Sequence, residues 1–417
     1  MQSSFLDIPV GHPFPLYNLP YGVFEYNGKT SVGVAIGDYV LDLTALEAKG
    51  LIKVKTLKGR EIFSGQSLNA FLKTGKACWS EVREFLRHFL AADTSDLRDN
   101  AQLQKELLIP QSFITMKMPI EVSGYTDFYS SIEHATNIGK MFRDANNPLL
   151  PNWRHLPVGY DGRASAIVVS GTKIKRPHGQ LKIGDNDPIY APTRQFDTEV
   201  ELGFIIGTGN DLGSPISIHS ATDHVFGAVM LLDWSARDIQ RWEYVPLGPF
   251  LGKNFGTTIS PWIVTMEALA PFSVPGPVQD PRPLPYLLKD VENFNINLHL
   301  EIKTPKMDAY QEIARTNYKH MYWDIAQQVA HHTANGCNLQ PGDVLGTGTI
   351  SGPTPDSCGS LIELTWGGAN PIKLISGEER VFLSDHDSMR VKGIASMGNL
   401  SIGFGYAEAT VASAVLT

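Results

Sequence analysis

Two glutamates alternate with aliphatic residues in the segment Phe-Asp-Thr-Glu-Val-Glu-Leu-Gly-Phe, at Glu199 and Glu201. This alternation is typical of a β-strand, in which successive side chains point to opposite faces. Both carboxylates then share one face, while Val200 and Leu202 share the other. Because a buried carboxylate without a counter-charge is costly, such a strand can border a hydrophobic core only if its acidic face is neutralised.

Two further acidic residues stand in other segments of the chain. Asp127 lies in Gly-Tyr-Thr-Asp-Phe-Tyr-Ser-Ser, and Asp233 closes a strongly apolar run. If these residues converge with Glu199 and Glu201, they form an all-oxygen, multiply anionic pocket that suits a hard cation such as Ca²⁺ or Mg²⁺. On spacing alone, a solvated strand face explains the two glutamates more often, and that alternative stays open at this point.

Short strands joined by turns dominate the rest of the chain, in keeping with 38 Gly and 27 Pro among 417 residues. We expect strands at 21–26, 31–43, 164–174, 196–206, 226–232, 294–304 and 360–366. Apolar spacing of three and four predicts helices at 67–72, 79–92 and 318–333. A further helix is expected to start near Ser235, with Asp238 as its capping-box partner, and 270–290 to form a proline-rich surface loop.

Composition excludes several classes of function. A net charge of -8 and the lack of a basic stripe argue against nucleic acid as a partner. The first residues lack the pattern of a signal peptide, and no apolar run approaches the roughly 20 residues of a membrane-spanning helix. Three cysteines show no metal-binding spacing and no disulfide framework, so we expect reduced thiols in a cytosolic protein.

Five long motifs surround the acidic residues. They are Asp-Phe-Tyr-Ser-Ser-x-x-His-Ala-Thr-Asn, Leu-Pro-Asn-Trp-x-His-Leu-Pro-Val-Gly-Tyr, Asp-Trp-Ser-Ala-Arg-Asp-Ile-Gln, Glu-Tyr-Val-Pro-Leu-Gly-Pro-Phe-Leu-Gly-Lys and Gly-Thr-Ile-Ser-Gly. In this order they resemble the fumarylacetoacetase family, and the resemblance runs nearly end to end. It implies a mainly β (α+β) fold, with a small SH3-like N-terminal β-barrel domain (1–117) and a large mixed β-roll catalytic domain (118–417).

The resemblance also implies an activity. Members of this family hydrolyse the carbon–carbon bond of 4-fumarylacetoacetate to fumarate and acetoacetate, the last step of tyrosine and phenylalanine catabolism, as cytosolic homodimers that depend on a metal. It implies Ca²⁺ ligands at Asp127, Glu199, Glu201 and Asp233. It further implies a second cation site, for Mg²⁺, at Asp233, Lys253 and Thr257, partly through backbone oxygens. Asp197 shares the strand face but falls outside the ligand set, so we expect it behind the ligands or exposed.

Catalytic and substrate-binding residues follow from the same resemblance. It implies that His134 is the general base and that Glu363, expected in the strand Leu-Ile-Glu-Leu-Thr-Trp, orients it. Arg237, Gln240 and Lys253 would stabilise the oxyanion and the departing carbanion. Substrate contacts are implied at Tyr129, Arg143, Tyr160, Gln240, Tyr244 and Thr349. The spacing of Arg237, Gln240 and Tyr244 alone fits one helix face, which could equally be a solvated stripe.

Two other interpretations compete with this one. A related enzyme on the same metal platform, such as an acylpyruvate hydrolase or an oxo-acid decarboxylase, generally lacks the long N-terminal domain and the His-plus-Glu pair placed as here. A non-catalytic protein with the same fold would have no reason to keep all seven of Asp127, His134, Glu199, Glu201, Asp233, Lys253 and Glu363. The neighbours His331 and His332 are no metal pair, because adjacent side chains on a helix diverge by about 100°.

Overall fold

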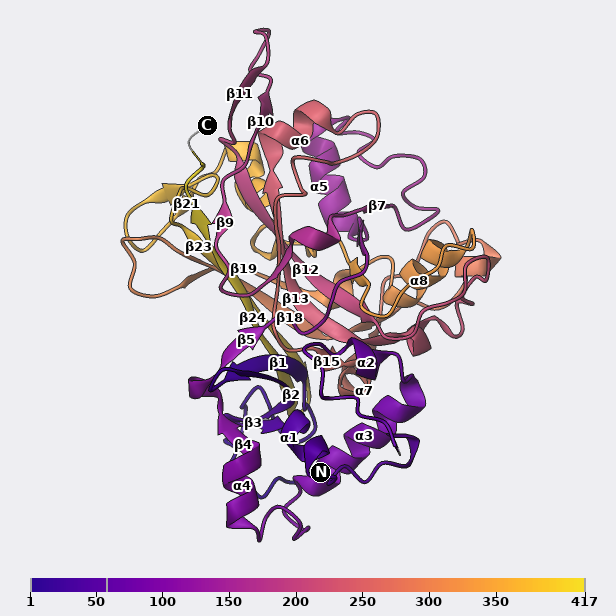
Figure 1. Ribbon diagram of the computed structural model, residues 1–417. Coiled ribbons are helices and arrows are strands. Elements are labelled where there is room, and N and C mark those ends of the chain that lie inside the picture. Colours follow the sequence, from indigo (N-terminus) through magenta and orange to yellow (C-terminus); the bar gives the residue numbers. More distant parts are fainter. Residues whose placement is uncertain (1, 58, 416–417) are drawn as a thin grey trace.

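A small N-terminal unit begins the chain, which a computed structural model describes over residues 2–57 and 59–415 (Figure 1). Its antiparallel five-stranded sheet has the order β4-β3-β2-β1-β5. The strands are β1 (Tyr21–Tyr26), β2 (Lys29–Ile36), β3 (Tyr39–Asp42), β4 (Leu108–Pro110) and β5 (Thr115–Lys117). Its helices are α1 (Leu43–Ala48), α2 (Asn69–Leu72), α3 (Lys76–Phe89) and α4 (Ala101–Leu107). The apolar face of α3 packs into the core of this unit through Trp79, Val82 and Leu86.

The larger unit is built around a mixed eight-stranded sheet. Its order is β7-β6-β20-β12-β13-β14-β8, and β15 pairs with β13 beyond this path. The strands are β6 (Tyr125–Phe128), β7 (Gly159–Asp161), β8 (Ile167–Val169), β12 (Phe196–Ile206), β13 (Val225–Ala236), β14 (Thr257–Ile259), β15 (Val264–Thr265) and β20 (Val344–Gly346). The long antiparallel pair β12–β13 forms its spine, and both strands are buried along their whole length.

A second sheet of five strands covers one face of this spine. Its order is β19-β18-β23-β24-β9, with β9 (Ile174–Lys175), β18 (Ile296–Lys303), β19 (Gln311–Asn317), β23 (Ser388–Met397) and β24 (Leu400–Ala412). Leu202 and Phe204 of β12 and Leu232 of β13 share a core with side chains of this sheet. On the opposite face of the spine, Ile205 and Leu231 belong to the core of the N-terminal unit. Because side chains alternate along β12, Glu199 and Glu201 lie on the same face as Ile205, away from the five-stranded sheet.

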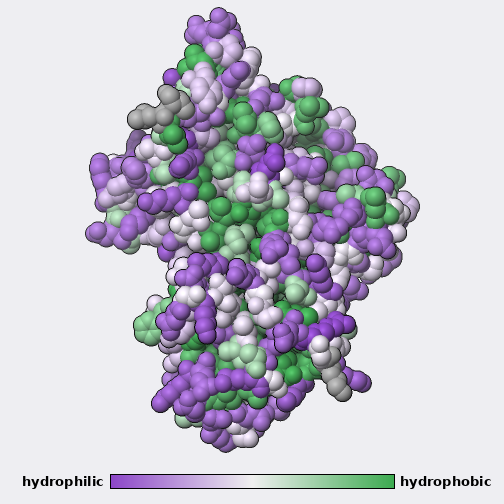
Figure 2. Space-filling view, viewed as in Figure 1, coloured by the Kyte–Doolittle hydropathy of each residue, from purple (hydrophilic) through white to green (hydrophobic). Residues whose placement is uncertain are grey.

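Short helices and three two-stranded ribbons complete the larger unit. The helices are α5 (Ile132–Phe142), α6 (Arg237–Glu243), α7 (Met266–Leu269), α8 (Ile325–Thr333) and α9 (Leu361–Leu364). The ribbons pair β10 (His178–Leu181) with β11 (Ile189–Pro192), β16 (Ser273–Pro275) with β17 (Glu292–Phe294), and β21 (Ile372–Lys373) with β22 (Glu379–Arg380). The β10–β11 ribbon projects from the body at the top of Figure 1. In Figure 2, hydrophilic residues dominate the periphery of the same face and hydrophobic residues gather towards its middle.

The mainly β class is confirmed, and the strands expected at 21–26 and 196–206 have those bounds in the structure. Three expectations about elements are wrong in whole or in part. The segment 360–366 contains the helix α9 rather than a strand, and 164–174 divides into a 3₁₀ turn and two short strands. Residues 318–333 form a 3₁₀ turn followed by α8. The helix expected near Ser235 is α6, which begins at Arg237, but the expected capping box is absent because Ser235 belongs to β13. Within residues 2–57 and 59–415, no helix is both long and apolar enough to cross a membrane.

Candidate active site

Strand pairing brings the acidic residues together. Glu199 of β12 lies directly opposite Asp233 of β13, and Asp127 of β6 pairs with Gly346 of β20, which itself pairs with β12. Carboxylate oxygens of Asp127, Glu201 and Asp233 all lie within 4.8 Å of one another, and all three residues are buried. The sheet register therefore gathers at one place acids that are far apart in the sequence.

Burial makes this group of three electrostatically unstable by itself. Loss of water raises the pKa of Asp127 to about 6 and raises the pKa of Glu201 and of Asp233 well above their ordinary values. Mutual repulsion among the carboxylates acts in the same direction for Glu201 and Asp233. A cation at this position would counter both the cost of burial and the repulsion between the carboxylates, because it favours the ionised form of each acid.

Unpaired oxygen atoms point to the same conclusion. Oδ1 of Asp127 and Oε1 of Glu201 are buried, and in the described part of the chain neither has a hydrogen-bond partner. Backbone crowds the cluster from β20, because a Cβ on Gly346 would lie 2.8 Å from Asp127 Oδ1 and 3.0 Å from Glu201 Oε2. The amide of Gly348 donates to Glu201 Oε2 at 3.0 Å. Carboxylate oxygens with no partner, held in a tight backbone cradle, fit a hard divalent cation.

Glu199 has a different environment, because basic residues meet both of its oxygens. Arg237 donates to Oε1 at 2.7 Å, and Lys253 bonds to Oε2 and also to Asp233. Burial alone would favour the neutral acid, but Arg237, Lys253 and His134 outweigh it and hold the pKa of Glu199 well below its ordinary value. Glu199 thus lies outside the group of three, and its place as a fourth cation ligand stays a prediction.

Asp197 is buried behind this site rather than exposed. It accepts from Arg237 Nε at 2.8 Å and from the backbone amides of Leu361 and Ile362 at 2.9 and 3.2 Å. Together, Asp197 and Glu199 outweigh the burial of the guanidinium and raise the pKa of Arg237 above its ordinary value. Arg237 is thus held in one orientation beside the acidic cluster.

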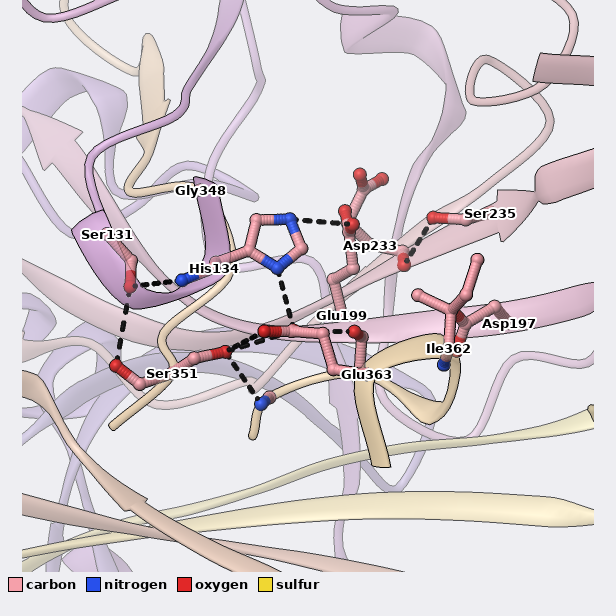
Figure 3. Close-up of polar contacts among 12 residues, drawn as sticks. Ser131, His134, Asp197, Glu199, Asp233, Ser235, Gly348, Ser351, Ile362 and Glu363 are labelled. Carbon is pink, nitrogen blue, oxygen red and sulfur yellow. Dashed lines mark hydrogen bonds and ion pairs between the residues drawn. The ribbon is translucent and has the colours of Figure 1, made fainter. Parts of the chain in front are cut away.

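His134 and Glu363 form a buried pair next to the cluster (Figure 3). Nδ1 of His134 lies 2.7 Å from Glu363 Oε2, and Nε2 lies 3.6 Å from Glu199 Oε1. His134 is in the first turn of α5, where Ser131 caps the helix by accepting from the His134 amide at 3.2 Å. If Nδ1 donates to Glu363, Nε2 is the basic nitrogen and it faces Glu199, next to the group of three acids.

Three other side chains hold Glu363, and the sequence analysis did not single them out. Asn137 donates to Oε1 at 3.0 Å, Ser351 lies 3.0 Å from both oxygens, and Ser360 donates to Oε2 at 2.7 Å. A signal existed for Asn137, because it follows His134 by three residues and therefore shares its helix face. Ser351 lies within the Gly-Thr-Ile-Ser-Gly motif.

A cavity of about 270 Å³ opens beside the acidic cluster. Asp233, Lys253, Thr257 and Tyr160 line it, together with Phe250 from the loop after α6. Thr257 is opposite Asp233 in the β13–β14 ladder, with 3.5 Å between Oγ1 and Asp233 Oδ1. The residues expected to hold a second cation are therefore adjacent, and they border a space that a small molecule can enter.

The remaining residues expected to contact substrate are spread around this region. The ring of Tyr129 meets the ring of His134 edge-on with centroids 5.3 Å apart, and Tyr160 pairs with Asp127 across β6 and β7. Gln240 on α6 accepts from Arg237 at 3.3 Å, and Thr349 is buried in the loop after β20. Two residues are exposed and lie further out. Tyr244 is the C-cap of α6, and Arg143 donates to the carbonyl of Pro148.

Two family models match the chain. "Fumarylacetoacetase N-terminal" matches residues 17–119, and "Fumarylacetoacetate (FAA) hydrolase C-terminal" matches residues 124–412. The fumarylacetoacetase of Homo sapiens is 50% identical over 418 residues, covering 99% of each chain. That of Dictyostelium discoideum is 51% identical, covering 98% of this chain and 97% of the relative. The chain belongs to the fumarylacetoacetate hydrolase family. It is accordingly a hydrolase.

Solved structures support the family fold. A fumarylacetoacetate hydrolase from psychrophilic Exiguobacterium antarcticum superposes with a TM-score of 0.53 at 18% identity, over 95% of this chain and 99% of that one. A putative HpcE protein from Mycobacterium smegmatis gives a TM-score of 0.54 at 18% identity, over 94% and 99%. At such low identity the likeness concerns architecture alone. In this fumarylacetoacetate hydrolase family member, the acids, the His134–Glu363 pair and Lys253 all meet on that architecture.

Proposed function

We propose that the protein hydrolyses 4-fumarylacetoacetate to fumarate and acetoacetate, the last step of tyrosine and phenylalanine catabolism. The observation that carries this proposal is the buried His134–Glu363 pair, in which Nε2 of His134 faces Glu199 beside the group of three acids. The chain that holds this pair is about half identical to fumarylacetoacetases along its whole length. The division into domains at 1–117 and 118–417, a cytosolic location and a homodimeric state are proposed with it, on the family resemblance.

Water activation is assigned to His134. Nε2 accepts a proton from water as the oxygen attacks a carbonyl carbon of the diketone, and Glu363 stabilises the imidazolium that forms. The carbon–carbon bond then breaks, and its electron pair leaves on the acetoacetate carbon. The imidazolium returns its proton to that carbon, which restores the neutral base. No protein nucleophile takes part, so no covalent intermediate accumulates.

A divalent cation, Ca²⁺ in our proposal, would be held by Asp127, Glu201 and Asp233, with Glu199 as a fourth ligand, and would act as a Lewis acid towards the diketone oxygens. Residues Asp233, Lys253 and Thr257 are proposed to hold Mg²⁺, partly through backbone oxygens. Asp127 and Glu201 fit the Ca²⁺ position because each has a buried carboxylate oxygen without a partner among the described residues. At the Mg²⁺ position, the Asp233 carboxylate lies beside the hydroxyl of Thr257.

Negative charge that develops on the substrate needs fixed donors. Arg237 and Lys253 are buried and held by Asp197, Glu199 and Asp233, so they need little reorganisation during the reaction. Gln240 is placed beside Arg237 at 3.3 Å. We assign these three donors to the oxyanion and to the departing carbanion.

Recognition of the two substrate carboxylates is assigned to the outer residues. We propose contacts from Tyr129, Arg143, Tyr160, Gln240, Tyr244 and Thr349. An arginine can hold a carboxylate by two parallel hydrogen bonds, and the exposed Arg143 would do so by exchanging its two contacts with the Pro148 carbonyl for the substrate.

Turnover of the substrate by purified protein tests the proposal. With fumarylacetoacetate and added Ca²⁺ or Mg²⁺, substrate should disappear and fumarate should form in equal amounts. The His134→Ala variant should have a kcat lower by about 10²-fold or more, the usual size of a general-base contribution. Turnover of an acylpyruvate, with fumarylacetoacetate left intact, would instead favour a related hydrolase of the same family.

A further inference from the structure

A second cavity lies where the N-terminal unit meets the larger unit, and it has a volume of about 250 Å³. One wall is α3, which presents Lys76, Trp79 and Arg83 on a single face at helical spacing. Opposite lie α7 and the first turn of α8 (Figure 1). The described residues that line this cavity include none of the proposed catalytic or cation-binding residues. Its volume is just below the roughly 300–1,000 Å³ of ordinary ligand sites, which suits a fragment-sized molecule.

Most of the cavity wall is apolar and rigid. Trp79, Phe226, Phe294 and Ile325 are buried side chains that line it. The rings of Trp79 and Phe226 meet nearly perpendicularly, with centroids 5.2 Å apart, which fixes both. A flat apolar body, such as an aromatic ring, fits such a wall.

Two polar groups that line the cavity, on Arg83 and Tyr21, have unused hydrogen-bonding capacity. Arg83 is buried and donates to the carbonyls of Asn18 and Tyr17 at 2.6 and 2.5 Å. Its Nε, however, is 3.7 Å from Glu267 Oε2, which is beyond hydrogen-bond distance. Burial lowers the pKa of Arg83, and the charge of Glu267 offsets this only in part. The hydroxyl of Tyr21, which also lines the cavity, is buried without a hydrogen-bond partner among residues 2–57 and 59–415.

Most acceptors on the same cavity are already occupied. The carboxylate of Asp324 accepts from the amides of Gln327 and Glu292 at 2.8 and 3.0 Å. Glu292 accepts from Ser273 at 2.6 Å, and Glu267 accepts from Ser80, while its second oxygen faces Arg83. Unused hydrogen-bonding capacity therefore remains on Arg83 Nε and the Tyr21 hydroxyl, and a carboxylate is a ligand group that can accept from both.

We infer that this junction cavity binds a small aromatic monocarboxylate, with its ring against Trp79 and Phe226 and its carboxylate towards Arg83. Lys76 and Lys289, whose side chains are 57% and 28% exposed, also line the cavity and pair with Asp223 and Glu292. A bound molecule would connect α3 to α7 and α8, so it would stabilise the contact between the two units.

A titration of the metal-loaded, full-length protein with 4-fluorophenylacetate tests the inference by ¹⁹F NMR and thermal unfolding. We expect saturable binding and a rise in Tm that grows with ligand concentration. The exposed Ala270 lines the cavity, and Ala270→Phe should fill its mouth and weaken binding by tenfold or more. Ala101→Phe, at the first position of α4 and outside the cavity, is the matched control and should bind like the wild type.

Replacement of the carboxylate by a neutral amide isolates the charged contact. 4-Fluorophenylacetamide should bind about tenfold more weakly than the acid, the loss expected for one charged hydrogen bond. Wild-type binding by Ala270→Phe, equal binding of acid and amide, or no saturation at millimolar concentration would each overturn the inference. Because no turnover is measured, these outcomes do not depend on the reaction proposed above.

Discussion

The bond between Glu363 and His134 offers the sharpest test of the proposed mechanism. Glu363→Gln keeps the shape of the side chain but removes the charge that stabilises a protonated His134. It also replaces one carboxylate oxygen by an NH₂ group, which would face either the donor Asn137 at the Oε1 position or the donor Ser360 at the Oε2 position. The loss of one charged hydrogen bond costs about 1.5–3 kcal/mol. If that loss falls on the transition state alone, kcat drops by about 10- to 150-fold while KM changes little.

The assay is steady-state formation of fumarate at saturating substrate. Glu133→Gln provides the matched control, since Glu133 is in the same helical turn as His134 and contacts Ser131 rather than the imidazole. The control should keep the wild-type kcat. A wild-type kcat in folded Glu363→Gln would refute the pairing and leave water activation to another group.

Acid stability provides a second measurement on the same variant. Burial favours the neutral form of Glu363, but His134 and the hydrogen bonds from Asn137 and Ser360 outweigh it and lower the pKa of Glu363 below its ordinary 4.5. A carboxylate with a lowered pKa stabilises the fold above its unfolded value, and that stability is lost as the pH falls through the folded value. Glu363→Gln should therefore lose less Tm than the wild type when the pH is lowered below about 4.5.

Three further outcomes are expected. Chelation of divalent metal should abolish turnover, Ca²⁺ or Mg²⁺ should restore it, and Asp233→Ala should be the most damaging ligand change; full activity of metal-free protein would contradict the cation proposal. Arg143→Lys should raise KM more than it lowers kcat, by the equivalent of about 1.5–3 kcal/mol, and an equal effect on a substrate analogue without that carboxylate would show that the role is structural. Gly346→Ala places a methyl group 2.8 Å from Asp127 Oδ1, so calorimetry should show weaker cation binding, and unchanged affinity would contradict the proposed cradle.

Strand periodicity predicted the spine of the structure well and short helices poorly. Acidic residues at 197, 199 and 201 alternate with Thr198, Val200 and Leu202, and an apolar run follows them, so the segment could be identified as β12 with its observed bounds. The segment around Glu363 also alternates, but α9 has only four residues, too few for periodicity to separate a helical turn from a strand. The contact between Ser360 and Glu363, three residues apart, is typical of a turn of helix.

Tertiary pairing overrode a local signal at the end of β13. Ser235 and Asp238 have capping-box spacing, yet Ser235 pairs with Asp197 in the β12–β13 ladder and the helix begins only at Arg237. Asp238 instead binds the hydroxyl of Thr193 and the amide of Arg194. Sequence motifs could indicate the residues of the site, but the environment of Glu199 depends on side chains that meet only after folding.

The β12–β13 ladder positions Glu199, Glu201 and Asp233, three of the acids proposed to bind a cation, through backbone pairing. Glu199 faces Asp233 across the ladder, and a slip of one residue would turn every acid on β12 towards the hydrophobic core. The residues proposed for substrate selection, such as Arg143 and Tyr244, lie instead at the ends of short helices. Those helix ends can therefore be lengthened or rebuilt in evolution, which would change the proposed substrate contacts, without moving the acids held by the sheet.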